Sequence, residues 1–269
     1  MTRIARVLSI ASSDSSGGAG IQADLRAFAA AGCHGTSVIV ALTAQNTREV
    51  SAVHAVPCDF VVAQLRAVFD DIGVDAAKTG MLFSAEIIES VATYLEGHPV
   101  PLVVDPVMVA SSGARLLRDD AVSVMVRRLF PLATVVTPNL PEAKALTGAD
   151  GSRRELAERL HAMGAPAVIV TGGHGSTAVD HLFDGRRHIE ILVPRHPVAA
   201  THGAGCTHSA TLAALLAQGW ALEDAARQAA TTAAAAVARG LVEIGEGAGP
   251  VDVLDVRSRV PVPHERPVT

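Results

Sequence analysis

Two kinds of hydrophobic pattern alternate along this chain. The first is a short, nearly continuous run of apolar and β-branched residues, which is typical of a strand buried on both faces. Such runs end in glycine, proline or small polar residues, which favour turns. The runs predict strands at residues 6–12, 36–44, 75–81, 101–108, 134–139 and 166–173, and residues 188–195 have the pattern of one part of a hairpin.

The second pattern places apolar residues three or four positions apart, as on one face of a helix. Ile21, Leu25 and Phe28 follow this spacing, and Gly32 ends the stretch. Ser84 stands where an N-cap is expected, directly before another such stretch. The pattern predicts helices at residues 20–32, 58–73, 84–97, 119–133, 141–148, 152–164, 206–219 and 221–240.

The order of these elements predicts the class of fold. Strand and helix alternate repeatedly, which favours an α/β fold with a central, mostly parallel sheet and helices on both faces. We find no repeat of fixed period and no low-complexity linker, so we expect a single domain over residues 1–269. The proline-rich tail at about residues 260–269 is expected to pack loosely.

Composition narrows the function. Hydrophobic residues make up 49% of the 269 residues, which is enough for a large core. The net charge is −5 with no basic block, which argues against nucleic acid as a partner. The N-terminal apolar run is too short for a signal peptide or a membrane span, so we expect a cytoplasmic protein. Cys33, Cys58 and Cys206 form no CxxC pair, so the chain lacks the sequence pattern of a disulfide framework or zinc site.

Polar clusters follow the predicted strands. Because ligands bind at the carboxyl ends of strands in open α/β sheets, clusters at these ends predict a site. The glycine-rich stretch at 13–20 has neither the Walker A nor the GxGxxG pattern. It is either an ordinary capped turn or a place where backbone approaches a small ligand. The clusters lie at residues 12–20, 43–46, 78–81, 105–108, 137–142 and 171–174.

The most specific of these stretches is Gly203-Ala204-Gly205-Cys206, directly before an apolar helix. Free N–H groups at the start of a helix, together with the helix dipole, bind anions. We expect this turn to hold a phosphate or a transferred phosphoryl group. The same position should lower the pKa of the Cys206 thiol, although a free cysteine is usually a small buried hydrophobe. For His202 and His208, which flank the turn, we expect surface or capping roles.

Two carboxylates are candidates for a cation site. Asp105 comes just after a strand, and Pro106 then breaks the strand pattern. Asn139 and Glu142 are three residues apart at a helix start, which also fits a simple capping box. The alternative hypothesis is that the side-chain oxygen atoms of Asp105, Asn139 and Glu142 help to hold Mg2+ together with water and phosphate.

Seven stretches occur in an order and spacing that resembles one known family. They are SDSSGGAGIQADL, ALTAQNT, KTGML, VVDPVM, TPNLPEA, VTGGH and HGAGCTHSA. The chain resembles the hydroxymethylpyrimidine and phosphomethylpyrimidine kinases of thiamine biosynthesis, which belong to the ribokinase-like superfamily. The resemblance runs from about residue 8 to about residue 239. It implies a ribokinase-like fold, ATP and Mg2+ as cofactors, and a homodimer.

The resemblance also implies roles for particular residues. The substrate is 4-amino-5-hydroxymethyl-2-methylpyrimidine or its monophosphate, and Gln45 matches the glutamine that hydrogen-bonds the pyrimidine. Asp24, Gly20, Met81 and Val107 match residues that line the same pocket. The remaining roles are the anion hole at Gly203, Ala204 and Gly205, the catalytic base at Cys206, nucleotide contacts at Asn139, Thr171 and Gly173, and the metal site at Asp105 and Glu142.

Four positions depart from the family pattern. Ala204 replaces a threonine in the anion turn, Thr171 replaces a lysine that faces the nucleotide, His208 stands where an apolar residue is common, and Ser12 replaces a glycine in the first motif. Two alternative functions follow. A pyridoxal or pyridoxine kinase would share the cysteine motif, and a ligand-binding protein with little turnover would fit the missing lysine.

Overall fold

The structure, a computed structural model, describes residues 3–109, 113, 117, 119–172, 178–198 and 200–259. Within these residues the strands form one sheet in the order β3-β2-β1-β4-β5-β6-β7-β8-β9. The five pairings from β2 through β1, β4, β5 and β6 to β7 are parallel. The strands are β1 (Arg6–Asp14), β2 (His34–Gln45), β3 (Val50–Ala55), β4 (Ala76–Thr79), β5 (Leu102–Val104), β6 (Val135–Val136), β7 (Val168–Val170), β8 (Val179–Phe183) and β9 (His188–Leu192).

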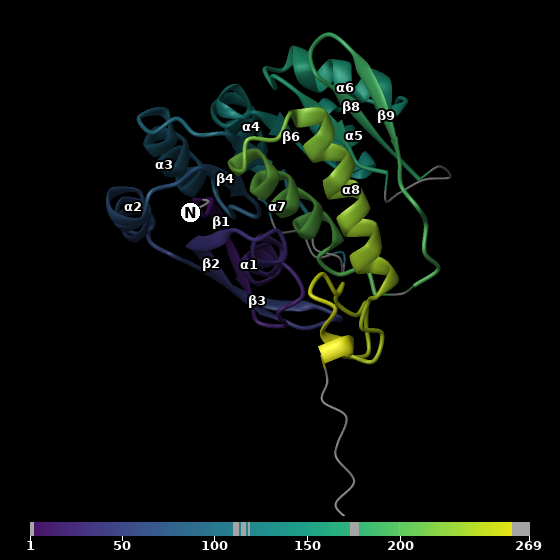
Figure 1. Ribbon diagram of the computed structural model, residues 1–269. Coiled ribbons are helices and arrows are strands. Elements are labelled where there is room, and N and C mark those ends of the chain that lie inside the picture. The colour runs from purple at the N-terminus through teal and green to yellow at the C-terminus, as the bar shows by residue number, and fades with distance from the viewer. Residues whose placement is uncertain are drawn as a thin grey trace, which may run out of the picture.

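Helices cover both faces of the sheet, as Figure 1 shows. One face packs against α1, α7 and α8, and the opposite face packs against α2 to α6. The predicted architecture is therefore confirmed. The helices are α1 (Gly20–Ala30), α2 (Cys58–Ala67), α3 (Ala85–Glu96), α4 (Asp119–Arg128), α5 (Leu140–Thr147), α6 (Arg153–Ala162), α7 (Ala204–Ala217) and α8 (Leu222–Ala238).

The buried strands pack through alternating side chains. In β5, Leu102 and Val104 belong to the core under α2 to α6, whereas Val103 faces the other helices. Successive side chains of a strand point to opposite faces, so a continuous apolar run fills both layers at once. This is why the short runs in the sequence predicted central strands.

Two strands were missed by the hydrophobic pattern. β3 is largely exposed and pairs antiparallel with β2 at one edge of the sheet. β8 was implied only as the partner of β9 in a hairpin, and it carries the polar residues Asp180 and His181. β3 is an edge strand without a second buried face, so its sequence does not show the apolar run. β8 lies buried between β7 and β9, but Asp180 and His181 interrupt its apolar run.

Two helix boundaries also differ from the prediction. The predicted helix over 58–73 ends at Ala67 and continues as a π-helical turn, Val68–Ile72. The helix expected to begin at Cys206 begins at Ala204, so the anion turn forms its first turn. Short 3₁₀ turns occupy Phe130–Leu132 and Val256–Arg259.

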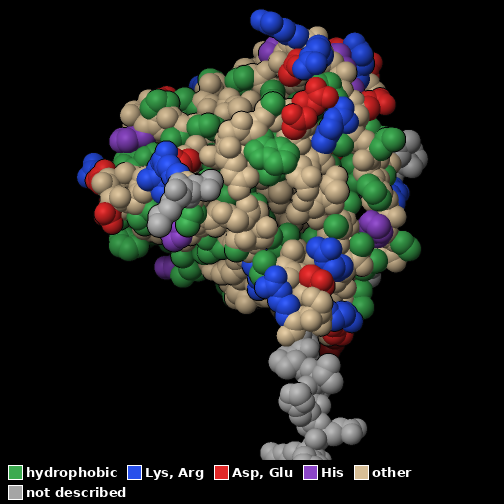
Figure 2. Space-filling view, in the orientation of Figure 1, with side chains coloured by type: hydrophobic (Ala, Val, Ile, Leu, Met, Phe, Trp, Pro, Cys, Tyr) green, Lys and Arg blue, Asp and Glu red, His purple; other side chains and the backbone are tan. Residues whose placement is uncertain are grey.

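The surface in Figure 2 carries acidic and basic side chains in mixture over the upper end of the view and near the C-terminal segment. The face of α7 and α8 seen there has no continuous basic area. Among the described residues, no helix has both the length and the apolar character needed to cross a membrane.

Candidate active site

The first turn of α7 carries backbone donors with no protein acceptor. Gly203 is the N-cap, with φ of 85°, a conformation that favours glycine. A side chain there would also collide with the carbonyl oxygen of Gly18. Within the described part of the chain, the N–H groups of Gly205 and Cys206 donate to no protein acceptor. Gly205 is exposed, with open space where a Cβ would lie. The turn can therefore receive an anion, as its sequence predicted.

A buried ion pair lies beneath this turn. Lys78 at the end of β4 and Asp24 on α1 are both fully buried, with Lys78 Nζ 2.9 Å and 3.0 Å from the two carboxylate oxygens of Asp24. Ser9 donates to Asp24 over 2.6 Å. Lys78 Nζ also lies 3.9 Å from Asp105 Oδ2. Burial lowers the pKa of Lys78, but the charges of Asp24, Cys206 and Asp105 raise it by more. The net pKa is above its ordinary value, so the ammonium stays charged.

Cys206 is half-buried, and the backbone N–H of Gly20 donates to its thiol. The expectation of a lowered thiol pKa is wrong in this structure. Burial raises the pKa of Cys206 to about 12, and the nearby Asp24 and Asp105 add to the rise. The positive charge of Lys78 and the Gly20 bond oppose this shift but do not overcome it. The helix N-terminus is outweighed because two carboxylates share the same buried space.

Asp105 and Glu142 form a second electrostatic group. Ser209 donates to Asp105 Oδ2 over 2.7 Å. Glu142 is buried and makes the capping box predicted for it, receiving the N–H of Asn139 while Asn139 Oδ1 receives its own N–H, both over 2.9 Å. Burial and the charge of Asp105 raise the pKa of Glu142 to about 8. The charge of Asp105 therefore disfavours the ionised form of Glu142.

This arrangement fits a divalent cation. A cation between two such carboxylates relieves their repulsion, and Mg2+ is commonly held by one or two carboxylates with water and phosphate. The described residues contain no cluster of three or more histidine, cysteine, aspartate or glutamate side chains that could hold a metal by itself. Capping by Glu142 and a role near a cation are compatible, because its two oxygen atoms can serve different partners.

The nucleotide-side candidates lie at the ends of β6 and β7. Asn139 and Thr171 form an isolated parallel bridge, and Thr171 donates its N–H to the carbonyl of Pro138 over 2.9 Å. Asp180 receives the N–H of Gly172 and lies 3.3 Å from His208 Nε2. His208 is buried, so the surface role expected for it is wrong. Gly173 lies outside the described residues.

The pyrimidine-side candidates come from four elements. Gln45 ends β2 and is half-buried, and its N–H donates to Ser15 Oγ over 2.8 Å. Gly20 begins α1 with φ of 56° against the Ser12 carbonyl. Met81 is buried and Val107 half-buried. Asp24, in contrast, has no exposed surface and acts on the site through Lys78.

Sequence reasoning assigned no role in the site to Lys78 or to His202. His202, directly before the anion turn, is buried with Nε2 2.9 Å from Asp14 Oδ2, so the surface or capping role expected for it is wrong. Its ring packs against Gly18, where a Cβ would strike it. Nothing in the local pattern predicts this contact, because His202 and Asp14 are 188 positions apart. The sequence indicated only that both residues lie in or next to stretches expected at the same edge of the sheet.

Comparison with known proteins agrees with this geometry. The family model for phosphomethylpyrimidine kinase matches residues 14–252. The chain is 49% identical over 259 residues to the hydroxymethylpyrimidine/phosphomethylpyrimidine kinase of Rhizobium meliloti, covering 93% of this chain and 97% of that one. It is 51% identical over 264 residues to the thiamine biosynthesis bifunctional protein ThiED of Geobacter sulfurreducens, covering 94% of this chain but only 54% of that longer protein.

A solved structure has the same fold. The pyridoxal kinase of Bacillus subtilis, in complex with ADP, has a TM-score of 0.84 and 37% identity, covering 95% of this chain and 99% of that one. The expected ribokinase-like fold is thus confirmed, as is the expected family. The family model covers most of the chain, and the residues that it spans include the strand ends and the anion turn. On this evidence the chain belongs to the phosphomethylpyrimidine kinase family.

Proposed function

We propose that this site transfers a phosphoryl group from ATP to the hydroxymethyl group of 4-amino-5-hydroxymethyl-2-methylpyrimidine, and then to its monophosphate. The protein is a kinase of thiamine biosynthesis, as its relatives are. One observation carries the proposal. The α7 turn with its free N–H groups lies beside Asp105, because Ser209 of the same helix donates to Asp105 and the charge of Asp105 acts on both Cys206 and Glu142, so the anion and cation sites would face one reaction centre.

Phosphoryl transfer depends mainly on positioning and on charge stabilisation. The N–H groups of Gly205 and Cys206, with the α7 dipole, would hold the oxygens of the transferred group, and Gly203 and Ala204 shape that turn. Lys78 keeps a positive charge beneath it. Asn139 and Thr171, joined at the ends of β6 and β7, would contact the nucleotide, and Gly173 would extend that contact.

Cys206 is proposed to accept the proton of the substrate hydroxyl. Its raised pKa of about 12 means that the thiolate is scarce at neutral pH but is a strong base when formed. On the opposite side of the site, Gln45 would hydrogen-bond the pyrimidine, while Gly20, Met81 and Val107 would surround the ring. Asp24 would act from below through Lys78.

We further propose Mg2+ as the cation. Asp105 and Glu142 would hold it, directly or through water, and it would neutralise phosphate charge during transfer. The raised pKa of the buried Glu142 beside Asp105 supports the assignment, since a cation there would favour the ionised form of Glu142.

Three further features are proposed from the family resemblance and the sequence. Residues 1–269 form one kinase domain, which the single sheet supports. The chain forms a homodimer. It works in the cytoplasm, where its three free cysteines would remain reduced.

The second candidate is a pyridoxal kinase, favoured by the structural likeness to the Bacillus subtilis enzyme. It is less favoured because the family model and the Rhizobium meliloti relative are named as phosphomethylpyrimidine kinases. The alternative of a ligand-binding protein without turnover is not favoured either, since these relatives are kinases.

Turnover measurements test the function. Purified protein with Mg-ATP is assayed for ADP release with the pyrimidine alcohol, with its monophosphate and with pyridoxal. We expect the highest kcat/KM with one of the two pyrimidines. A much larger kcat/KM with pyridoxal would overturn the proposed substrate, and binding of pyrimidine without ADP release would overturn catalysis.

A further inference from the structure

His202 connects the anion turn to the residue proposed to read the pyrimidine. Its Nε2 lies 2.9 Å from Asp14 Oδ2 and 3.4 Å from the amide nitrogen of Gln45. Ser16 Oγ lies at 3.4 Å from the same nitrogen. His202 and Asp14 are both buried, so these contacts are shielded from water. A buried histidine thus touches both halves of the site.

The partner Asp14 determines where His202 carries its proton. Asp14 Oδ2 also receives the N–H of Ala19 over 2.8 Å, and Oδ1 receives the N–H of Ser16 over 2.8 Å. Burial raises the pKa of Asp14, but these bonds and the one from His202 outweigh it and lower the pKa. Asp14 is therefore an ionised carboxylate, which only accepts hydrogen bonds. Nε2 of His202 must then bear hydrogen, whether the ring is neutral or charged.

That hydrogen restricts the amide of Gln45. The amide has two orientations, which exchange Oε1 and Nε2. With the NH2 group toward His202, two donors face each other over 3.4 Å. With Oε1 toward His202, the oxygen faces the Nε2–H, whose main acceptor is Asp14 Oδ2 at 2.9 Å and which reaches Oε1 as a weak second acceptor at 3.4 Å. The NH2 group then turns to Thr43 Oγ1, which lies 3.2 Å from the other end of the amide.

Thr43 completes the chain of hydrogen bonds. Its single hydroxyl hydrogen lies within reach of two acceptors, the carbonyl oxygen of Ser13 at 3.0 Å and Gln45 Oε1 at 3.2 Å. When it donates to Ser13 over the shorter distance, the hydroxyl oxygen is free to accept from the NH2 group of the turned amide. No two donors then face each other along His202, Gln45, Thr43 and Ser13. The opposite orientation leaves the His202 and Gln45 donors in conflict. The fixed orientation leaves the substrate one amide N–H and one lone pair of Oε1.

We propose that His202 is a positioning residue that fixes the Gln45 amide and thereby selects an aminopyrimidine substrate. The inference rests on the proposed function. A ring that carries an amino group beside a ring nitrogen offers one donor and one acceptor, which match the free lone pair and N–H of Gln45. The 4-oxo analogue of the substrate reverses this pattern, with an acceptor oxygen beside a ring N–H. A glutamine amide held in one orientation discriminates between the two, whereas an amide free to rotate does not.

The test compares the two substrates in a His202→Leu variant. We measure kcat/KM for the 4-amino alcohol and for its 4-oxo analogue, and take their ratio. A good bidentate amide contact discriminates on the order of tenfold or more between such edges, so we expect the wild-type ratio to fall by about that factor. A general loss of structure would lower both values together and leave the ratio unchanged.

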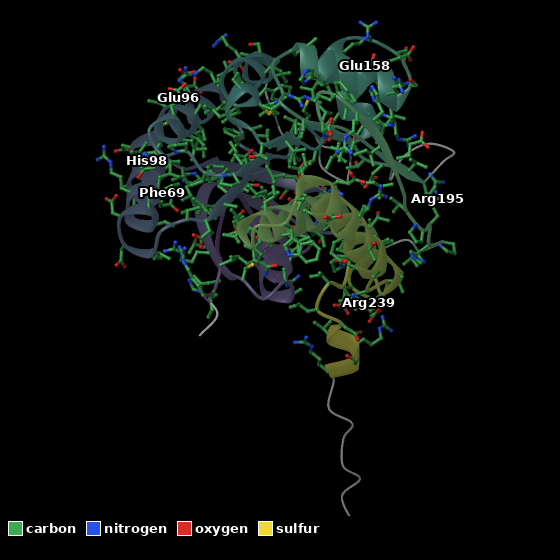
Figure 3. The ribbon with its side chains drawn as sticks, turned by 45° about the horizontal axis from the view of Figure 1, so that its top comes forward. Phe69, Glu96, His98, Glu158, Arg195 and Arg239 are labelled. Carbon is green, nitrogen blue, oxygen red and sulfur yellow. The ribbon has the colours of Figure 1, made fainter. Side chains whose placement is uncertain are left out.

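A second buried histidine provides the matched control. His181 on β8 is as buried as His202, and its Nε2 lies 2.9 Å from His188 Nδ1. His188 pairs with Glu158, which Figure 3 places at the outer side of α6, away from α1. His181→Leu should leave the substrate ratio unchanged.

Thr43 provides a variant that does not depend on the stability of His202→Leu. Thr43→Val keeps the shape of the side chain but removes the acceptor for the Gln45 amide, so the ratio should again fall. Thr43→Ser restores the hydroxyl and should restore the ratio. A ratio within twofold of wild type in both His202→Leu and Thr43→Val would overturn the inference, as would such a ratio in Thr43→Val alone if His202→Leu does not fold.

The two proposals fail in different ways. If the wild-type protein does not phosphorylate the 4-amino alcohol, the proposed function is wrong and this inference is removed with it. If the wild type phosphorylates it and the variants keep the wild-type ratio, only the role of His202 is wrong.

Discussion

The buried lysine at the centre of the site allows a quantitative prediction. Lys78→Met keeps much of the side-chain volume but removes the charge that Asp24 and Asp105 face at 2.9 Å and 3.9 Å. Neither Lys78 nor Asp24 has exposed surface, so water cannot replace the ammonium. Breaking a buried ion pair by removing one partner costs about 3–5 kcal/mol, because the other charge is left uncompensated.

This cost converts into a shift of melting temperature. The entropy of unfolding is about 2.1 cal/mol/K per residue, which gives roughly 0.56 kcal/mol/K for the 269 residues. A loss of about 4 kcal/mol then lowers Tm by about 7 °C. Differential scanning calorimetry at pH 7.5, without nucleotide, measures this shift.

The chain offers a control and a rescue. Its only other lysine, Lys144, pairs with Asp150 at 2.7 Å, but both side chains are substantially exposed. Lys144→Met should therefore lower Tm by about 2 °C or less, since an exposed pair contributes only about 0–1 kcal/mol. Adding Asp24→Asn to Lys78→Met removes the buried carboxylate that has lost its ion-pair partner, so the double variant should recover part of the lost stability. A Tm for Lys78→Met within 2 °C of wild type would refute the reasoning.

Three further predictions concern the reaction. Cys206→Ser should keep the fold and lower kcat by about 10²–10⁴-fold, and Cys206→Asp should recover part of the activity. Because the pKa of Cys206 is about 12, the wild-type rate should rise with pH up to at least pH 9, whereas a near-normal kcat in Cys206→Ser would make the thiol a packing residue. Glu142→Gln keeps the capping box but should lower turnover at least tenfold. The pKa of Glu142 is about 8 in the folded protein and lower in the unfolded chain, so the stability of the wild type without divalent cations should fall as pH rises from about 4.5 through 8. The Tm of Glu142→Gln should therefore exceed that of the wild type at pH 8.5 and match it near pH 4.5, and an identical pH dependence of Tm in both proteins would contradict this. Gly203→Ala should lose about 1–3 kcal/mol of stability and most turnover, since φ of 85° and the Gly18 carbonyl exclude a side chain; wild-type melting and kinetics would show that the turn can relax.

Particular residues show why some of the site could be predicted and some could not. Gly203 to Cys206 were found because an anion turn is local, with glycines and a helix start adjacent in the chain. Asn139 and Glu142 were found for the same reason, since a capping box spans three residues. The Lys78–Asp24 pair was not, because its partners are 54 positions apart and each occupies an ordinary position within its own element.

The sequence by itself determined the alternation of strands and helices, the sheet edge at which polar residues gather, and the anion turn. These follow from periodicity and backbone chemistry, which act over a few residues. Only the tertiary structure decided the ionisation of the site. Folding buries Cys206 and Glu142 beside Asp105, which raises both pKa values, and it brings Asp14 against His202. Electrostatic energies depend on the burial and distance of groups far apart in the chain, and local sequence contains neither quantity.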